Sequence, residues 1–184
     1  MMDLNFNFKH KNEVRLIGQI VHVFDTGKNG RMIVTLDVSR KNFPKVLIWG
    51  KLAEKVKALP EDYAVVSIVG NIQHSYRDDG ISYMIFGTEL EVVHPKTLYQ
   101  NEFQICGNVR KIYEFKNKTV IYVNTLTNSH FSVVPLTIYS TDTRLLSFEY
   151  GQPITGMGKI VSKVGNLADG SKTYCYEYVA DFII

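Results

Sequence analysis

Aromatic and basic side chains alternate over residues 43–51, in the stretch Phe-Pro-Lys-Val-Leu-Ile-Trp-Gly-Lys. Because successive side chains of a strand point to opposite faces, Phe43, Lys45 and Trp49 would share one face. The other face would carry Val46 and Ile48, which are common core residues. Flat rings beside cations can stack on planar ligands and bind anionic ones. An alternative is that both faces are buried, as in a strand between two layers.

Further candidate residues lie close to this stretch in the chain. Arg40 and Lys41 come directly before it, and Lys51 ends it. Tyr76 lies in a predicted hairpin loop, where it could stack on a ligand or brace the hairpin. Four more basic residues could extend the positive track, depending on how the loops fold over the face: Arg15, Lys28, Arg31 and Arg77.

Hydrophobic alternation predicts five strands in the first half of the chain, over residues 14–24, 32–38, 43–49, 63–74 and 82–93. A helix is predicted over 51–59, because Leu52, Val56 and Leu59 fall at i, i+4 and i+7 and Pro60 follows. Five strands with a helix between the third and the fourth is the order of the OB-fold, a small Greek-key barrel.

The first strand has a counterpart later in the chain. Asn12-Glu13 precedes Gly18 as Asn101-Glu102 precedes Gly107, and such internal similarity predicts two copies of one fold. Strands are expected again over 102–113, 119–126, 131–139, 152–164 and 172–183, with at most two helical turns in 140–150. The predicted fold class is therefore all-β, with two tandem OB-folds, each a five-stranded Greek-key barrel. The expected division is an arm (1–11), a first barrel (12–94), a linker (95–100) and a degenerate second barrel (101–184).

The second copy carries its own aromatic candidates. Its third strand places Phe131 and Tyr139 on one face, with Tyr139 in the place of Trp49 and Phe131 a candidate for the part of Phe43. That strand has no lysine or arginine, so weaker binding or a role in assembly is expected. An aromatic and basic cluster at the first turn of this copy is more typical of local packing than of a binding groove: Tyr113, Phe115, Lys116, Lys118 and Tyr122.

Composition limits the function classes. The chain has 184 residues, 45% of them hydrophobic, with a net charge of +3 and a pI of about 8.7. It has no apolar run of membrane-spanning length and no signal peptide, so a cytoplasmic protein is expected. Cys106 and Cys175 are expected to be reduced, buried thiols. Without a phosphate loop, metal motif or nucleophile motif, we expect no enzyme, no metal and no cofactor.

The segments 12–20 and 46–54 (VLIWGKLAE), together with Gly70-Asn71-Ile72 and residues 83–93, resemble those of bacterial single-stranded DNA-binding proteins. The resemblance implies sequence-independent binding of single-stranded DNA in replication, recombination or repair. It places base-stacking positions at Phe43, Trp49 and Tyr76. By the chemistry of the residues, Arg40, Lys41, Lys45 and Lys51 would contact the phosphates.

The resemblance also bears on partners. Most members of that family have one barrel and form tetramers, while a minority have two barrels and pair as dimers, so a homodimer is expected here. The family's acidic C-terminal tail is missing, which argues against recruitment of replication or repair proteins through a tail. Two alternatives stay open. One is an OB-fold assembly subunit of a replication or restart complex that binds protein, and the other is an RNA-binding barrel.

Overall fold

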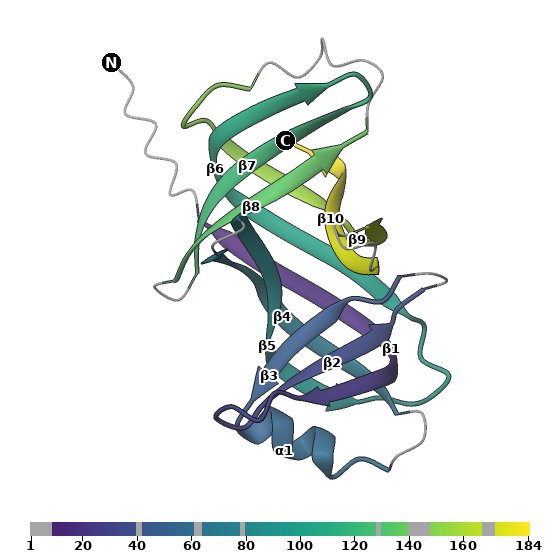
Figure 1. The fold of residues 1–184 in the computed structure, drawn as a ribbon. Coiled ribbons are helices and arrows are strands. Elements are labelled where there is room, and N and C mark those ends of the chain that lie inside the picture. The colour runs from purple at the N-terminus through teal and green to yellow at the C-terminus, as the bar shows by residue number, and fades with distance from the viewer. Residues whose placement is uncertain are drawn as a thin grey trace.

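The structure is a computed structural model that describes residues 9–39, 42–60, 64–77, 80–127, 130–139, 148–166 and 172–184. Strands make up most of it, and Figure 1 shows two groups of strands stacked along the long axis of the molecule. The elements are β1 (Lys11–Asp25), β2 (Arg31–Asp37), β3 (Lys45–Trp49), α1 (Lys51–Lys57), β4 (Val65–Arg77), β5 (Gly80–Val92), β6 (Gln100–Phe115), β7 (Lys118–Thr127), β8 (His130–Ile138), β9 (Pro153–Asn166) and β10 (Lys172–Ile183).

The first five strands form a closed barrel. They pair in the order β2-β3-β5-β4-β1, and β1 pairs again with β2, so no edge is left in this circuit. The order is that of an OB-fold, which confirms the prediction of an all-β protein with an OB-fold barrel. The last five strands repeat the order as β6-β7-β8-β10-β9, with β6 pairing β9. We refer to β1–β5 with α1 as the N-terminal barrel and to β6–β10 as the C-terminal half.

Binary patterning explains these strands. In β2 and β3 the side chains that alternate inward are fully buried, among them Val34, Leu36, Val46 and Ile48. The helix α1 follows directly, because Gly50 adopts a positive φ of 56° that turns the chain from strand to helix. Figure 1 shows α1 across the end of the N-terminal barrel, where Val56 and Ala53 are buried. The helix ends at Lys57, two residues before the predicted end.

The two halves are joined by antiparallel pairing of β1 with β6, in which Val14 lies opposite Phe103. The halves make matching contacts about this pair. Asn12 donates from Nδ2 to the carbonyl of Ile72 (2.7 Å) and accepts the N–H of Ile72 at Oδ1 (2.8 Å). Asn101 makes the same two bonds to Ile160, at 2.8 and 3.0 Å. The Asn-Glu similarity in the sequence thus marks equivalent positions around an approximate two-fold axis.

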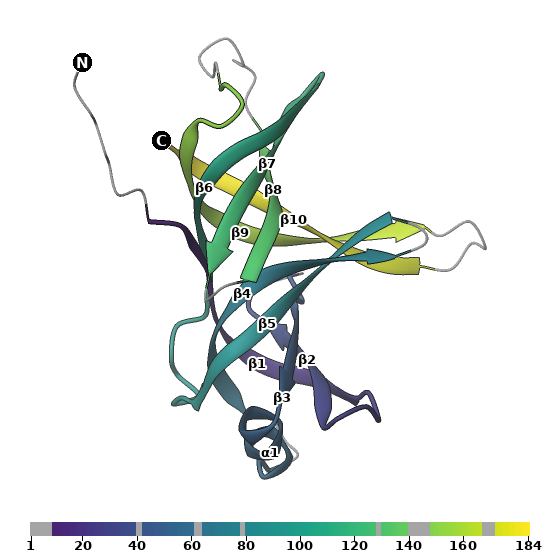
Figure 2. The same ribbon diagram turned by 90° about the vertical axis from the view of Figure 1, so that its left-hand side faces the viewer.

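Two hairpins project beyond the strand circuits, as Figure 2 shows for β4–β5 and β9–β10. The sequence places Tyr76 in a hairpin loop, but in the structure it is part of β4 and pairs with Ile81. The prediction was wrong because the strand continues past the barrel. Both cysteines are free, and Cys106 is buried as expected. Cys175 is exposed, because it lies in the projecting part of β10 and not in the core.

Candidate nucleic-acid interface

The outer surface of β1, β2, β3 and β5 carries a cross-strand array of apolar and basic side chains. Phe24 pairs with Ile33, Ile33 with Leu47, and Leu47 with Phe86. Because directly paired residues share a face, these four side chains form one row across the barrel. Rows on either side contain Arg31 with Trp49 and Lys45 with Thr35, which is polar and buried. We call these eight residues the Trp49 face: Phe24, Arg31, Ile33, Thr35, Lys45, Leu47, Trp49 and Phe86.

Trp49 is the most distinctive member of this face. It is 45% exposed, whereas its strand neighbour Ile48 is fully buried. The indole meets the ring of Phe86 edge to face, with centroids 5.8 Å apart and planes at 72°. One side of the indole is therefore held by a neighbour, while nearly half of the residue stays open to solvent, as stacking on a base requires. This corrects the alternative that both faces of β3 are buried.

Cations border the exposed rings. Arg31 lies directly across from Trp49, and Lys45 is half-buried on the same strand as Trp49. Lys28 is exposed in the turn before β2, where its carbonyl accepts the N–H of Arg31 at 3.0 Å. Lys51 is exposed at the start of α1. Of the eight predicted phosphate-binding residues, Arg31 and Lys45 thus lie on this face, and Lys28 and Lys51 lie within three residues of its members in the chain.

Of the other four predicted cations, the structure places the side chain of only Arg15, and it does not lie on the Trp49 face. Arg15 lies where β1 pairs with β4 and β6, and its Nε donates to Glu13 Oε1 at 2.7 Å. That hydrogen bond raises the pKa of Arg15 and commits its charge locally. Arg40 and Lys41 lie outside the described residues. Arg77 lies in β4, and its side chain is outside the described part of the chain.

Phe43 is fixed between the two halves. Its N–H donates to Ser162 Oγ (2.9 Å), and its carbonyl accepts the hydroxyl of Tyr176 (3.3 Å). Asn42 Oδ1 accepts the N–H of Ser162 at 3.2 Å. The segment that enters β3 is therefore anchored on β9 and β10, and the Phe43 side chain is half-buried there. It shares the face alternation of Lys45 but lies at the opposite end of β3 from Trp49.

The C-terminal half has an equivalent surface on β6, β7 and β8. Tyr113 pairs with Val120 and Val120 with Thr137, and parallel rows hold Lys111 with Tyr122 and Pro135, and Phe115 with Lys118. Tyr139 follows β8 on the same face, with Lys118 Nζ 6.0 Å from its ring centroid. We call this set the Tyr139 face: Lys111, Tyr113, Phe115, Lys118, Val120, Tyr122, Pro135, Thr137 and Tyr139.

The carboxylate of Glu177 binds three side chains at the Tyr139 end of that face. Glu177 accepts from Lys118 at Oε1 (2.9 Å), and at Oε2 it meets Lys163 (2.7 Å) and the Tyr139 hydroxyl (2.5 Å). Lys163 also donates to the Tyr139 hydroxyl at 2.6 Å. Burial alone would raise the pKa of Glu177, but these hydrogen bonds outweigh it and lower the pKa to about 2. Tyr139 is thus held rigidly while it remains 47% exposed, and two lysines share one anion.

Tyr76 and Phe131 lie at the seam between the halves and not beside Trp49. Tyr76 is five residues beyond Asn71, the partner of Phe86, so it lies on the other face of the β4–β5 hairpin. His74 contacts the rings of Tyr76 and Phe131, with centroids 5.2 and 6.5 Å apart. The N–H of Val133 donates to His74 Nδ1 at 3.3 Å, which makes Val133 and not Phe131 the counterpart of Phe43.

Three apolar members of the Trp49 face were missed in the sequence. Phe24, Ile33 and Phe86 lie 9 to 62 residues from Leu47 or from each other along the chain, and strand register brings them together. Phe24 is 53% exposed at the end of β1. The sequence did contain one signal for this face: Phe24 is an aromatic residue at the end of a strand with regular hydrophobic alternation.

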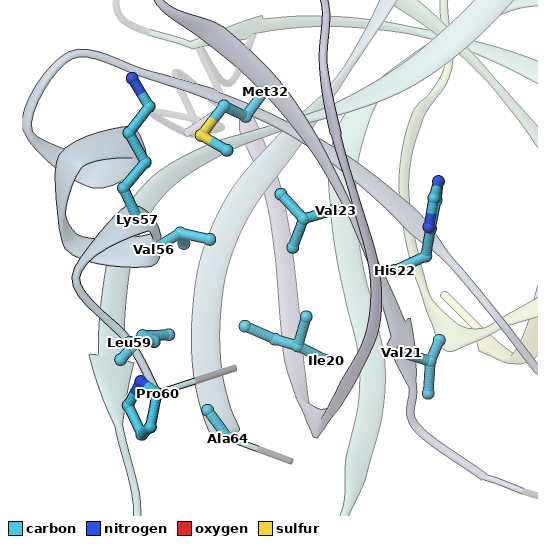
Figure 3. A pocket seen from close by; sticks show the side chains of 10 residues that line it. All are labelled: Ile20, Val21, His22, Val23, Met32, Val56, Lys57, Leu59, Pro60 and Ala64. Atoms are coloured by element: carbon cyan, nitrogen blue, oxygen red, sulfur yellow. The ribbon is translucent and has the colours of Figure 1, made fainter. Parts of the chain in front are cut away.

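A separate pocket of about 380 Å³, lined mostly by residues of apolar type, lies between β1, β2 and α1 of the N-terminal barrel. Figure 3 shows Ile20, Val23, Met32 and Val56 gathered around it. Lys57 and His22 are its only basic lining residues among those described. It therefore lacks the charge needed to follow a phosphate backbone.

The described part of the chain contains no group of three or more His, Cys, Asp or Glu side chains placed to hold a metal ion. Among the same residues, no helix has the length and apolar character needed to cross a membrane.

No protein-family model matches this chain, and no curated protein matches it in sequence. The fold does match solved structures. The wild-type single-stranded DNA binding protein from Thermus aquaticus superimposes with a TM-score of 0.67 at 13% identity, covering 96% of this chain and 93% of that one. A deletion mutant of the same protein gives the same score and identity, with 96% and 94% covered. At this identity the match shows the fold: this chain has the architecture of that protein along nearly its whole length.

Proposed function

We propose that this protein binds single-stranded DNA without sequence preference, through the Trp49 face. The observation that carries the proposal is the pairing of Arg31 with a half-exposed Trp49 on the outside of a barrel whose inward-facing side chains are buried. Every base has a flat face on which an indole can stack, and each stacked base contributes about 1–3 kcal/mol. The cations nearby would add a phosphate term that weakens with salt.

The fold match supports the same proposal, because the similar Thermus aquaticus protein is described as a single-stranded DNA binding protein. We propose further that the two halves are tandem OB-folds, with the division 12–94 and 101–184. On this proposal the chain pairs as a homodimer and works in the cytoplasm in DNA replication, recombination or repair. It would act as a binding protein and not as an enzyme. Its mass in solution, measured by light scattering with and without oligonucleotide, tests the dimer.

Binding is tested by titrating oligo-dT while following the fluorescence of Trp49, the single tryptophan of the chain. Strong quenching that weakens with added salt is expected. Emission that stays unchanged at high oligonucleotide concentration would refute the proposal and favour the protein-binding assembly subunit. RNA oligomers of matched sequence, used as competitors, test the RNA-binding alternative, and DNA is expected to compete better.

Lys45→Glu tests the phosphate contact on the same face. Lys45 lies on the face with Trp49 and is half-buried against the strand, so its charge is close to any backbone that crosses the rings. The variant should bind more weakly and show a shallower dependence of affinity on salt, by about one phosphate. Lys96→Glu, on the exposed connection between β5 and β6, is the matched control. An unchanged salt slope for Lys45→Glu would remove this lysine from the contact.

A further inference from the structure

A pocket of about 230 Å³ lies where the β4–β5 hairpin of the N-terminal barrel meets the Tyr139 face. Tyr76 and Ile81 form the hairpin wall. The other wall comes from the C-terminal half and includes Arg110, Lys111 and Tyr113. The pocket is therefore built from both halves of the chain, and neither half has it alone.

Both walls present aromatic rings that are held in place and still open to solvent. Tyr76 is 70% exposed and Tyr113 is 40% exposed. Tyr113 is supported by Tyr122, whose ring meets it edge to face at 5.6 Å, and Lys111 Nζ lies 4.4 Å from its centroid. On the opposite wall Tyr76 rests against His74. Fixed rings lose little conformational entropy when a planar group stacks on them.

The hairpin wall is anchored to the C-terminal half. The backbone N–H of Val133, in β8, donates to His74 Nδ1, and the His74 ring also contacts Phe131. Burial, together with the positive charge of Arg110, lowers the pKa of His74 and keeps this nitrogen an acceptor at neutral pH. The two walls are thus set at a fixed separation by a bond between the halves.

Among the described residues, no carboxylate compensates the positive charge of the pocket. Arg110 and Lys111 are both exposed, no described residue forms an ion pair with either, and no carboxylate is among the described lining residues. At the other end of the same face, Glu177 neutralises part of the charge of Lys118 and Lys163. Within the Tyr139 face and its border, an anion is therefore drawn to the Arg110 end.

We propose that this pocket binds one nucleotide of a single DNA strand, with the base against Tyr76 and Tyr113 and the phosphate at Arg110 and Lys111. The inference rests on the proposed function and assigns a second contact region to it. Tyr76 faces away from the surface that bears Phe86, so the strand reaches the pocket only after passing the hairpin. Only an oligonucleotide long enough to span both sites uses the pocket.

The test compares two pocket variants, Tyr113→Ala and the double variant R110E/K111E, with the wild-type protein. Oligo-dT of graded length is titrated by fluorescence anisotropy of a terminal label. Tyr99→Ala, with a ring 42% exposed on the connection before β6, and Lys96→Glu are the matched controls. Thermal melting establishes that each variant folds, and the double variant changes only exposed side chains.

For the wild-type protein, affinity should rise when the oligonucleotide becomes long enough to reach the pocket. Both pocket variants should lose that rise and bind the long oligonucleotide at least about fivefold more weakly. Their affinity for short oligonucleotides that quench Trp49 should stay unchanged. Oligonucleotides carrying 5-iododeoxyuridine should crosslink to peptides containing Tyr76 or Tyr113.

The outcomes separate the two proposals. If the wild-type protein quenches with oligo-dT but both pocket variants bind every length as the wild type does, the pocket proposal is overturned while the proposed function stands. If the wild-type protein binds no oligonucleotide, both proposals fall. If the pocket variants change the mass of the protein in solution and leave DNA affinity intact, the pocket is a contact between copies and does not bind nucleotide.

Discussion

Replacing Trp49 with alanine separates a binding role from a structural one. The indole is 45% exposed, so its truncation removes roughly half of the contacts of a buried ring. Full burial of a large apolar side chain contributes about 1.5–3 kcal/mol, which predicts a loss of roughly 1–2 kcal/mol in the free energy of unfolding, including the Phe86 edge contact. A domain of ordinary stability tolerates this and stays folded.

Trp49→Ala should have a larger effect on the affinity for single-stranded DNA than on stability. One stacked base is worth about 1–3 kcal/mol, which corresponds to roughly 5- to 150-fold in affinity for single-stranded DNA. Because the variant has no tryptophan, binding is followed by anisotropy of labelled oligo-dT and folding by circular dichroism. Trp49→Phe keeps a ring and should recover part of the affinity, and Tyr99→Ala, with 42% exposure, controls for loss of an exposed aromatic ring.

Two results would refute this reasoning. A folded Trp49→Ala protein that binds oligo-dT as tightly as the wild type would show that the indole stacks on no base. An unfolded protein would show that the ring belongs to the core, contrary to its exposure.

Four further predictions concern stability, each measured by chemical or thermal unfolding. Asn12→Leu leaves the backbone N–H and carbonyl of Ile72 unpaired in a buried site and should lower the free energy of unfolding by about 2–4 kcal/mol. A loss below about 0.5 kcal/mol, on the order of measurement error, would contradict this. Gly107→Ala sets a Cβ against the carbonyl oxygen of Asn124 and should cost at least about 1–3 kcal/mol, whereas Gly151→Ala, where no atom lies within 4 Å, is strained by its φ of 80° alone and should cost less. Glu177→Gln should destabilise the protein by about 1–3 kcal/mol at pH 7; because the folded-state pKa of this carboxyl is lowered from 4.5 to about 2, the difference from wild type should disappear as pH falls through that range, and a difference independent of pH would refute it. His74→Asn keeps an acceptor that does not titrate. Since the pKa of His74 is lowered below 6.5 in the folded state, the stability of the wild type should fall more than that of the variant as pH drops below 6.5, and equal losses would contradict this.

The fold was predictable because its information is local. Hydrophobic alternation identified the inward-facing residues of each strand. Gly50, followed directly by the helix pattern, marked the end of the third strand of an OB-fold. The length of the projecting hairpins was not predictable. The part of β4 that contains Tyr76 extends beyond the barrel, so its side chains do not alternate between a core and solvent. Its neighbourhood is set by the other half of the chain, through His74 and Val133.

The candidate site was predictable where it lies on one strand and not where it depends on register. Lys45 and Trp49 share β3, and their common face follows from the strand period. Arg15 does not lie on the face of Lys45 and Trp49; it bonds Glu13, which is two residues earlier on the same side of β1. Glu177 is 59 residues from Lys118 and 38 from Tyr139, so no spacing rule reveals that it holds both.

The pairing of β1 with β6 has a mechanical consequence. Residues 14–17 of β1 pair on one side with β4 and on the other with β6. The same stretch of β1 therefore completes the N-terminal barrel and joins it to the C-terminal half. A hinge between the halves would have to break this shared ladder. The shared sheet therefore fixes the distance between the Trp49 face and the Tyr139 face. On the proposed function, a single strand that contacts both faces would follow a path whose length the protein sets before binding.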